Sequence, residues 1–314
     1  MSESPILVPT ATPPPKASQL HFVDEANLPK LNGANLLLAF SGWMDGGLVS
    51  TGTVQRLLKV SDSQLVASID PEPFYIYNFP GAMEITALFR PHVRYEAGVI
   101  SDFDLPTNEF HCDTSRNTVF FLGKEPNLAW QSFGECIFEF IARVGVKRVI
   151  FIGSFGGSVP HTREPRLYAS VSDPALKAQL EPFGVRFSDY EGPGSFASYL
   201  LSQAPKRGVE MISLSAEIPG YLDGMNPLSI EAVTRQLAAL LALPMDLDEL
   251  RHASNEWENQ VTTAVEKDTD LAATVRQLEE RYDNELIGSP QPESEESEEH
   301  DESDDDDDEA DDDE

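Results

Sequence analysis

The stretch VIFIGSFGGSVPHTREP, residues 149–165, joins an apolar run to a glycine-rich segment and then to His161, Thr162 and Arg163. An apolar run bounded by glycines is typical of a buried strand that ends in a tight turn. We therefore interpret it as an inner strand followed by a glycine turn. Such a turn either serves close packing alone or places backbone amides and polar side chains around a ligand.

Other apolar runs of the same length surround this stretch in the sequence. They are nearly continuous in apolar character, which is typical of strands covered by helices on both faces. Segments with helical periodicity separate them, and this alternation predicts a three-layer α/β/α sandwich with a largely parallel or mixed sheet. The predicted strands are residues 35–40, 64–69, 118–123, 148–153 and 210–216.

The helical segments carry recognisable start and stop residues. Asn127 is the expected N-cap of a helix that ends at Gly145. Ser195 is the expected cap of a second helix. It is not an expected nucleophile, because the order Gly-Pro-Gly-Ser-Phe does not form a nucleophile elbow. Asn226 caps a third helix, with Pro227 at the first helical position.

The segment after residue 245 is charged, favours helix and lacks strand character. Leu271, Val275, Leu278 and Tyr282 recur at spacings of four, three and four, which indicates a narrow apolar seam on one helix. We expect a helical hairpin that docks on the core or on another subunit. The predicted parts of the chain are a flexible lead-in (1–20), an α/β core (21–245), the helical extension (246–287) and a disordered acidic tail (288–314).

Charge and composition exclude several classes of function. The net charge is −32, and residues 293–314 hold 17 acidic and no basic residues; the other 37 acidic and 22 basic residues give −15. An acidic body does not favour binding to nucleic acid or to an anionic membrane. The two cysteines have no metal-ligand spacing, so we expect no metal site. The N-terminus lacks a secretory pattern and no apolar stretch reaches about 20 residues, so we expect a cytoplasmic protein.

Another glycine turn, the first along the chain, is FSGWMDGG at residues 40–47; it follows the first strong strand and precedes a helix. It fits neither the dinucleotide pattern nor the P-loop, and Asp45 would repel a phosphate. The carboxyl ends of parallel strands meet at one edge of a sheet, so both turns and Glu217 are expected there. The candidate ligand-binding residues are Gly42, Asp45, Gly46, Gly47, Gly153, Gly156, Gly157, His161, Arg163 and Glu217.

The order of these motifs resembles the PAC2 family, named for proteasome assembly chaperone 2, and most of all its bacterial branch. The resemblance covers roughly residues 20–287 and includes FSGWMDGG, GKEPNLAWQSF, VIFIGSFGGSVPHTREP, YEGPGSFASYLL and EIPGYLDGMNP. It implies a fold related to the purine nucleoside phosphorylases, self-association and, as in archaeal and eukaryotic relatives, a role in proteasome assembly or binding. It implies no catalytic residues and no cofactor. Some proteasome-binding relatives end in a hydrophobic residue, Tyr and one further residue, whereas this sequence ends in DDDE.

We therefore favour a non-catalytic, homo-oligomeric protein, with a trimer as one candidate state and a proteasome-related protein as a candidate partner. The alternative is a binding protein or hydrolase for a nucleoside-like or phosphorylated small molecule, which would use both glycine turns. For the helical extension, packing on a second subunit and packing within its own subunit both remain open. The residues expected to make that contact are Trp257, Val261, Leu271, Val275, Leu278 and Tyr282.

Overall fold

The computed structural model describes residues 19–287, so the predicted acidic tail, and nearly all of the predicted lead-in, lie outside the described residues. The elements are listed here in chain order with their bounds. They are β1 (Leu20–Phe22), β2 (Ala34–Ser41), α1 (Val49–Lys59), β3 (Gln64–Ile69), α2 (Met83–Ala87), β4 (His92–Glu96), β5 (Val99–Asp104), β6 (Glu109–Asp113), β7 (Thr118–Lys124), α3 (Trp130–Val144), β8 (Val146–Gly157), β9 (Leu167–Val171), α4 (Lys177–Leu180), β10 (Arg186–Phe187), α5 (Phe196–Gln203), β11 (Glu210–Pro219), α6 (Pro227–Leu240), α7 (Asp248–Val265) and α8 (Thr269–Ile287).

A nine-stranded mixed sheet forms the centre of the molecule, in the order β1-β3-β6-β7-β2-β8-β11-β9-β10. The four middle strands, β7, β2, β8 and β11, run parallel to one another. Antiparallel pairing begins on either side of them, between β6 and β7 and between β11 and β9. The predicted α/β fold with a largely parallel or mixed sheet is confirmed.

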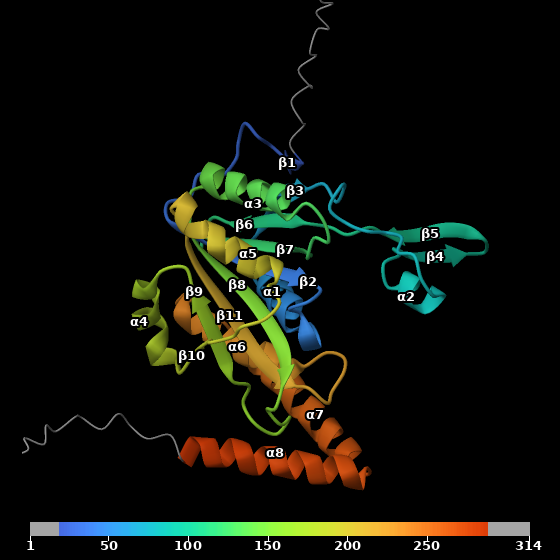
Figure 1. Cartoon of the computed structure of the whole chain (residues 1–314). Helices are drawn as coiled ribbons and strands as arrows, with labels where there is room; N and C mark the ends of the chain where they lie inside the picture. The colour runs from blue at the N-terminus through green and yellow to red at the C-terminus, as the bar shows by residue number, and fades with distance from the viewer. Residues whose placement is uncertain (1–18, 288–314) are drawn as a thin grey trace, which may run out of the picture.

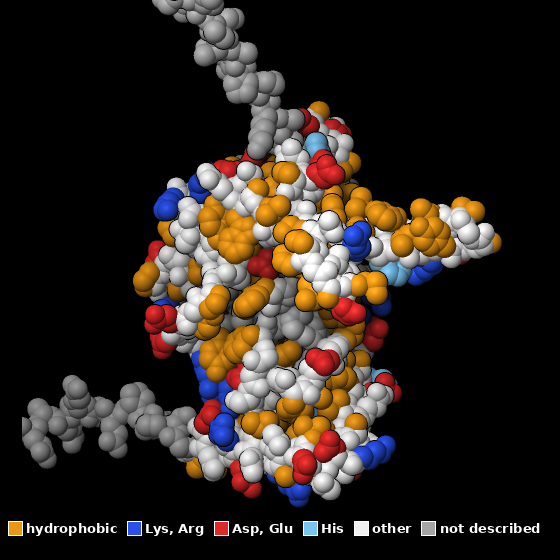
Figure 2. All heavy atoms as spheres, turned by 45° about the vertical axis from the view of Figure 1, so that its right-hand side comes forward, with side chains coloured by type: hydrophobic (Ala, Val, Ile, Leu, Met, Phe, Trp, Pro, Cys, Tyr) orange, Lys and Arg blue, Asp and Glu red, His pale blue; other side chains and the backbone are white. Residues whose placement is uncertain are grey.

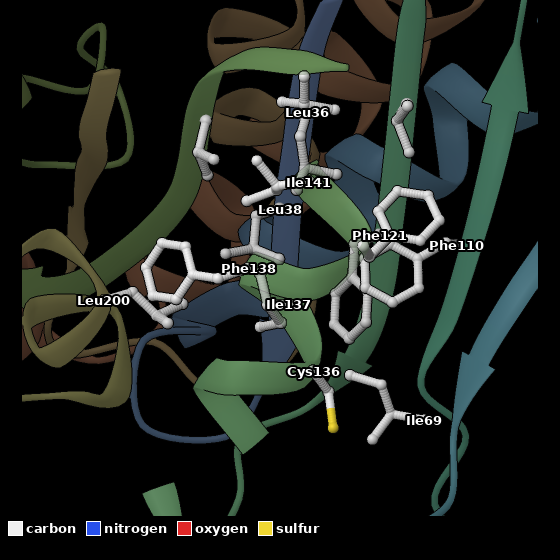
Figure 3. Close-up of a cluster of buried hydrophobic side chains, with 14 of the residues drawn as sticks. Leu36, Leu38, Ile69, Phe110, Phe121, Cys136, Ile137, Phe138, Ile141 and Leu200 are labelled. Carbon is white, nitrogen blue, oxygen red and sulfur yellow. The ribbon is translucent and has the colours of Figure 1, made fainter. Parts of the chain in front are cut away.

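Helices cover both faces of this sheet, as Figure 1 shows. Alternate residues of β2 enter different cores: Leu36 and Leu38 pack with α3 and α5, whereas Leu37 and Ala39 pack with α1 and α6. Because successive side chains of a strand point to opposite faces, a strand between two helical layers must be apolar throughout. Figure 3 shows the first of these cores, where Leu36, Leu38 and Phe121 of the sheet meet Ile137 and Ile141 of α3.

Two local predictions need correction. The strand predicted at 148–153 continues to Gly157, so Gly153, Gly156 and Gly157 belong to β8 rather than to a turn. The backbone stays extended there because β8 pairs with β11 as far as Gly157. Asn127 is not the cap of α3: the cap is Ala129 in the left-handed region, while the Asn127 side chain accepts a hydrogen bond from the Ile76 amide.

The other predicted start and stop residues are confirmed. The side chain of Ser195 accepts a hydrogen bond from the Ser198 amide, and that of Asn226 accepts one from Ser229. Gly145 ends α3 in a left-handed conformation, with a φ of 91°. These caps fix where α3, α5 and α6 lie against the sheet.

Two features extend beyond the sandwich. The helices α7 and α8 lie past the carboxyl ends of the middle strands, and α8 crosses the lower end of the molecule in Figure 1. At the right of Figure 1 a segment that we call the arm, residues 79–105, projects from the body and carries α2, β4 and β5. Within residues 19–287 its two strands pair only with each other.

Candidate functional site

The carboxyl ends of β2, β8 and β11, with the turns that follow them, form one connected region that we call the sheet edge. The Met44 carbonyl accepts a 2.8 Å hydrogen bond from the Ser154 amide, and the Gly46 carbonyl accepts one of 2.6 Å from the Ser154 hydroxyl. The Asn226 amide donates to the Gly47 carbonyl at 2.8 Å. The structure therefore brings the first glycine turn beside the end of β8.

His161 is 1% exposed and lies directly beyond this edge. Its Nδ1 lies 2.7 Å from the Tyr221 hydroxyl, which also accepts the His161 backbone N–H at 2.9 Å. Its Nε2 lies 3.1 Å from the Thr262 hydroxyl of α7. Burial lowers the pKa of His161, so the neutral ring is favoured. Both ring nitrogens thus join the loop after β8 to other parts of this chain.

Arg163 and Thr162 contact α8. The Arg163 guanidinium donates two parallel hydrogen bonds to the Asp283 carboxylate, at 2.9 Å and 2.8 Å. The Thr162 hydroxyl donates to Glu279, one turn earlier on the same helix. Hydrogen bonding to Asp283 raises the pKa of Arg163, and the same contact lowers the pKa of Asp283. These bonds hold α8 against the loop after β8.

Glu217, near the end of β11, is buried and does not form a hydrogen bond with His161. Its Oε1 accepts a 2.7 Å hydrogen bond from the Ser158 amide. Its Oε2 lies 3.3 Å from Nη1 of the buried Arg166 and 3.4 Å from the Tyr168 hydroxyl. Glu217 and His161 therefore do not form an acid/base pair.

The residues predicted for the helical contact face their own subunit to different degrees. Val275 is buried, and Trp257, Val261, Leu271, Leu278 and Tyr282 are half-buried. The Tyr282 ring lies 4.4 Å under the Arg166 guanidinium, and its hydroxyl donates to the Glu164 carbonyl at 3.0 Å. The α7–α8 pair thus packs on the body through polar contacts as much as through its apolar seam.

Sequence reasoning missed a carboxylate that clamps two loops of the sheet edge. Glu125, which follows β7, accepts the Trp43 amide on Oε2 at 3.1 Å and the Phe196 amide on Oε1 at 2.8 Å. It therefore ties the turn after β2 to the first residue of α5. The sequence signal for Glu125 was a charged residue directly after a buried strand. Its two partners lie far away in sequence, so only the fold reveals them.

The arm is the second feature that sequence reasoning missed. Ala97 and Gly98 join β4 to β5 with positive φ angles of 50° and 84°, as a tight two-residue hairpin turn requires. A bulge in the hairpin leaves Tyr95 opposite Ile100, and Val93 opposite Phe103. Residues directly opposite each other share a face, so these four side chains form one apolar surface. We call it the arm face.

The arm holds a disproportionate share of the exposed apolar surface. Of the 20 large hydrophobic side chains exposed among residues 19–287, nine lie between residues 79 and 105. Figure 2 shows hydrophobic side chains spread over the projecting arm. Apolar surface gathered in this way usually marks a site of interaction. The nine are Phe79, Met83, Ile85, Leu88, Tyr95, Val99, Ile100, Phe103 and Leu105.

Between residues 19 and 287, no cluster of three or more His, Cys, Asp or Glu side chains is arranged to hold a metal ion. Over the same range, no helix combines the length and the apolar character needed to cross a membrane.

Comparison with known proteins gives a family match over most of the chain. The model of the PAC2 family matches residues 39–265 of this chain. A comparison with curated proteins gives no match.

Solved structures with the same fold come from several bacteria. A Mycobacterium tuberculosis protein of unknown function is 23% identical with a TM-score of 0.75, over 87% of this chain and 92% of that one. A proteasome-assembly chaperone homologue from the same organism is 25% identical with a TM-score of 0.66, over 77% and 99%. A PAC2 family protein from Streptomyces avermitilis is 26% identical with a TM-score of 0.65, over the same shares.

Proposed function

This chain belongs to the PAC2 family, and from that premise we propose that it is a non-catalytic, self-associating protein with a role in assembling a proteasome-related complex. The observation that carries the proposal is the apolar arm face, which stands away from the body on a hairpin without a partner strand among the described residues. Covering such a surface removes apolar area from water and stabilises an assembly.

The occupant that we propose for the arm face is the sheet edge of a second copy. Exposed apolar side chains also lie there: Trp43 after β2, Phe155 near the end of β8 and Met225 before α6. An arm that binds a different surface of the next copy makes a head-to-tail contact, and such contacts close into rings when the rotation allows. We propose a small ring, such as a trimer, as the state that this contact forms.

The same surfaces suit a chaperone role. An arm face covered by a second copy is released when the copies separate, and it can then bind an apolar surface of an unassembled subunit. One relative of similar fold is described as a proteasome-assembly chaperone homologue, which supports a partner of that kind. The contacts of His161, Thr162 and Arg163 with α7 and α8 favour a structural role for that loop, and this supports the non-catalytic interpretation.

The test of self-association replaces two residues of the arm face, Tyr95→Lys with Phe103→Lys, and measures mass by light scattering. Because both side chains are more than half exposed, the change should leave the fold intact while charging the contact. We expect the oligomer to dissociate to monomer. The matched control is Val23→Lys with Val60→Lys, two exposed apolar residues on the body, which should leave the mass unchanged.

A second comparison separates the arm from the helical extension. Leu278→Asp with Tyr282→Asp introduces two charges into α8. If this variant dissociates while the arm variant keeps its mass, the contact belongs to α7 and α8, and the arm proposal is wrong. The chaperone role is tested with purified proteasome α subunits from the source organism, whose assembly should be faster with the wild-type chain than with the arm variant.

A further inference from the structure

A cavity of about 400 Å³ lies between the sheet edge and the root of the arm. Ser41 of β2 and Lys124 of β7, which are paired in register, form one wall. Thr51 of α1 forms a second wall, and Arg90 of the arm, between α2 and β4, forms a third. A volume of this size matches the pockets that bind small molecules. The cavity is separate from the loop that carries His161 and Arg163.

Two polar groups in this cavity have no partner of the expected kind. The Tyr77 hydroxyl is buried and has no hydrogen-bond partner among the described residues. The Lys124 ammonium has no carboxylate within ion-pair distance in residues 19–287; it lies 5.7 Å from the Tyr75 ring. A buried hydroxyl left without a partner costs free energy, so a ligand that supplies an acceptor is favoured.

Several other polar groups of the cavity have partners within the chain. Asp45 accepts hydrogen bonds from the Thr51 amide at 3.0 Å and the Thr51 hydroxyl at 2.7 Å. Asp104 lies 3.5 Å from His92, and the Arg90 guanidinium donates to Asn78 at 3.1 Å. The Lys124 ammonium and the buried Tyr77 hydroxyl are thus donors still open to an incoming group, and Arg90 keeps further N–H donors beside them. Burial raises the pKa of Tyr77, so its hydroxyl stays protonated and serves as a donor.

The walls also carry apolar side chains. Leu48, Phe89, Leu105 and Leu122 line the cavity, and they come from the residue after the first glycine turn, the arm and β7. A ligand that fills the space must therefore present hydrocarbon as well as an acceptor. A doubly charged phosphate is disfavoured because the Asp45 carboxylate lines the same cavity.

We propose that this cavity binds a small organic anion, a single carboxylate on an apolar or aromatic body, with the carboxylate held by Lys124 and the Tyr77 hydroxyl. A charge-assisted hydrogen bond from an ammonium is roughly twice as strong as a neutral one, and the carboxylate accepts both donors at once. Because its walls come from both the body and the arm, the bound ligand ties the arm root to the sheet edge. The site does not depend on self-association.

The probe is benzoate, titrated into the full chain and followed by saturation-transfer NMR. A ligand of this size is expected to bind with a dissociation constant on the order of 1 mM. Benzamide, which has the same shape without the charge, should bind at least about tenfold more weakly. Hydrogen exchange should slow in the amides around Lys124 and the arm root, which locates the site.

Two variants and one control decide the assignment. Lys124→Met should weaken benzoate binding by about tenfold, and Tyr77→Phe, which removes one oxygen atom, by several-fold. Lys206→Met, an exposed lysine distant in the fold, should leave binding unchanged. Unchanged binding in both cavity variants overturns the proposal, as does an absence of binding at about 20 mM, roughly twenty times the expected constant. Phosphate that binds as tightly as benzoate overturns the assignment to a carboxylate.

Discussion

Arg163 and Asp283 are joined by two parallel hydrogen bonds, which connect the loop after β8 to the last described helix. The pair lies 120 residues apart in sequence, so it closes a long segment that contains β9, β11 and α6. Because both side chains are partly exposed, the contact is open to salt and to mutation.

We expect Arg163→Met to loosen α8 from the body without unfolding the sandwich. The guanidinium is the donor in both hydrogen bonds to Asp283, so its loss leaves that end of α8 held by fewer contacts. Hydrogen exchange in α8 should speed up several-fold, and 1 M salt should produce part of the same effect in the wild-type chain. Arg281→Met, an exposed change on the same helix, should leave exchange unaltered.

The stability of the folded chain should fall as the pH drops below about 6.5, and His161 should account for part of this loss. Burial lowers the pKa of His161 in the folded chain, and Glu279 opposes this shift. The unfolded chain therefore binds a proton at a higher pH than the folded chain, so acid favours unfolding. Denaturant midpoints of the wild-type chain and of His161→Asn, compared between pH 8 and pH 5.5, measure this contribution.

Other groups titrate in both chains, so the contribution of His161 is the difference in pH dependence between the wild-type chain and His161→Asn. The free energy of unfolding should depend less steeply on pH in His161→Asn than in the wild-type chain. His252, which is exposed on α7, supplies the control: His252→Asn should keep the wild-type pH dependence. Equal slopes for all three chains would show that His161 is not linked to folding.

Glu217→Gln should destabilise the chain by about 3 kcal/mol, because it leaves the buried Arg166 without its buried carboxylate. The double variant Glu217→Gln with Arg166→Met should recover part of that loss, since neither charge then remains alone. Urea unfolding of the wild-type chain, the two single variants Glu217→Gln and Arg166→Met, and the double variant gives the coupling free energy. A cost below about 1 kcal/mol for the single change would mean that Glu285 alone is sufficient for Arg166.

Gly47→Ala tests the close approach of the first glycine turn to the start of α6. Gly47 has a φ of 62°, and an added Cβ would lie 2.8 Å from the Cβ of Asn226. Gly33 has nearly the same φ of 66° but open space around it. Gly47→Ala should therefore cost at least about 1 kcal/mol more than Gly33→Ala. Equal costs would place the whole effect in the backbone conformation.

Much of the fold could be predicted because its middle strands are apolar on both faces. The run at 35–40 lies within β2, and the runs at 118–123 and 210–216 lie within β7 and β11. The end of β8 could not be predicted from local sequence. Its glycines suggest a turn, whereas pairing with β11 keeps that backbone extended.

The candidate site was harder to predict because its residues act through distant partners. The gathering of both glycine motifs and Glu217 at one edge follows from parallel strands, and the structure has this arrangement. His161 contacts Thr262 of α7 and Arg163 contacts Asp283 of α8, 101 and 120 residues further along the chain, and no local pattern encodes these partners. The arm went unrecognised because its alternating apolar residues have no covering layer, so burial could not be inferred from them.

The strand order also constrains how the chain folds as it leaves the ribosome. β2 lies between β7 and β8, and β8 lies between β2 and β11. β2 is complete once Ser41 has been made, but β11, which pairs with the far edge of β8, begins only at Glu210. During synthesis the apolar first half of the sheet therefore exists before its far side has been made. Long-range parallel pairing of this kind is slow, and the edges of the unfinished sheet stay open to wrong partners until translation passes Pro219.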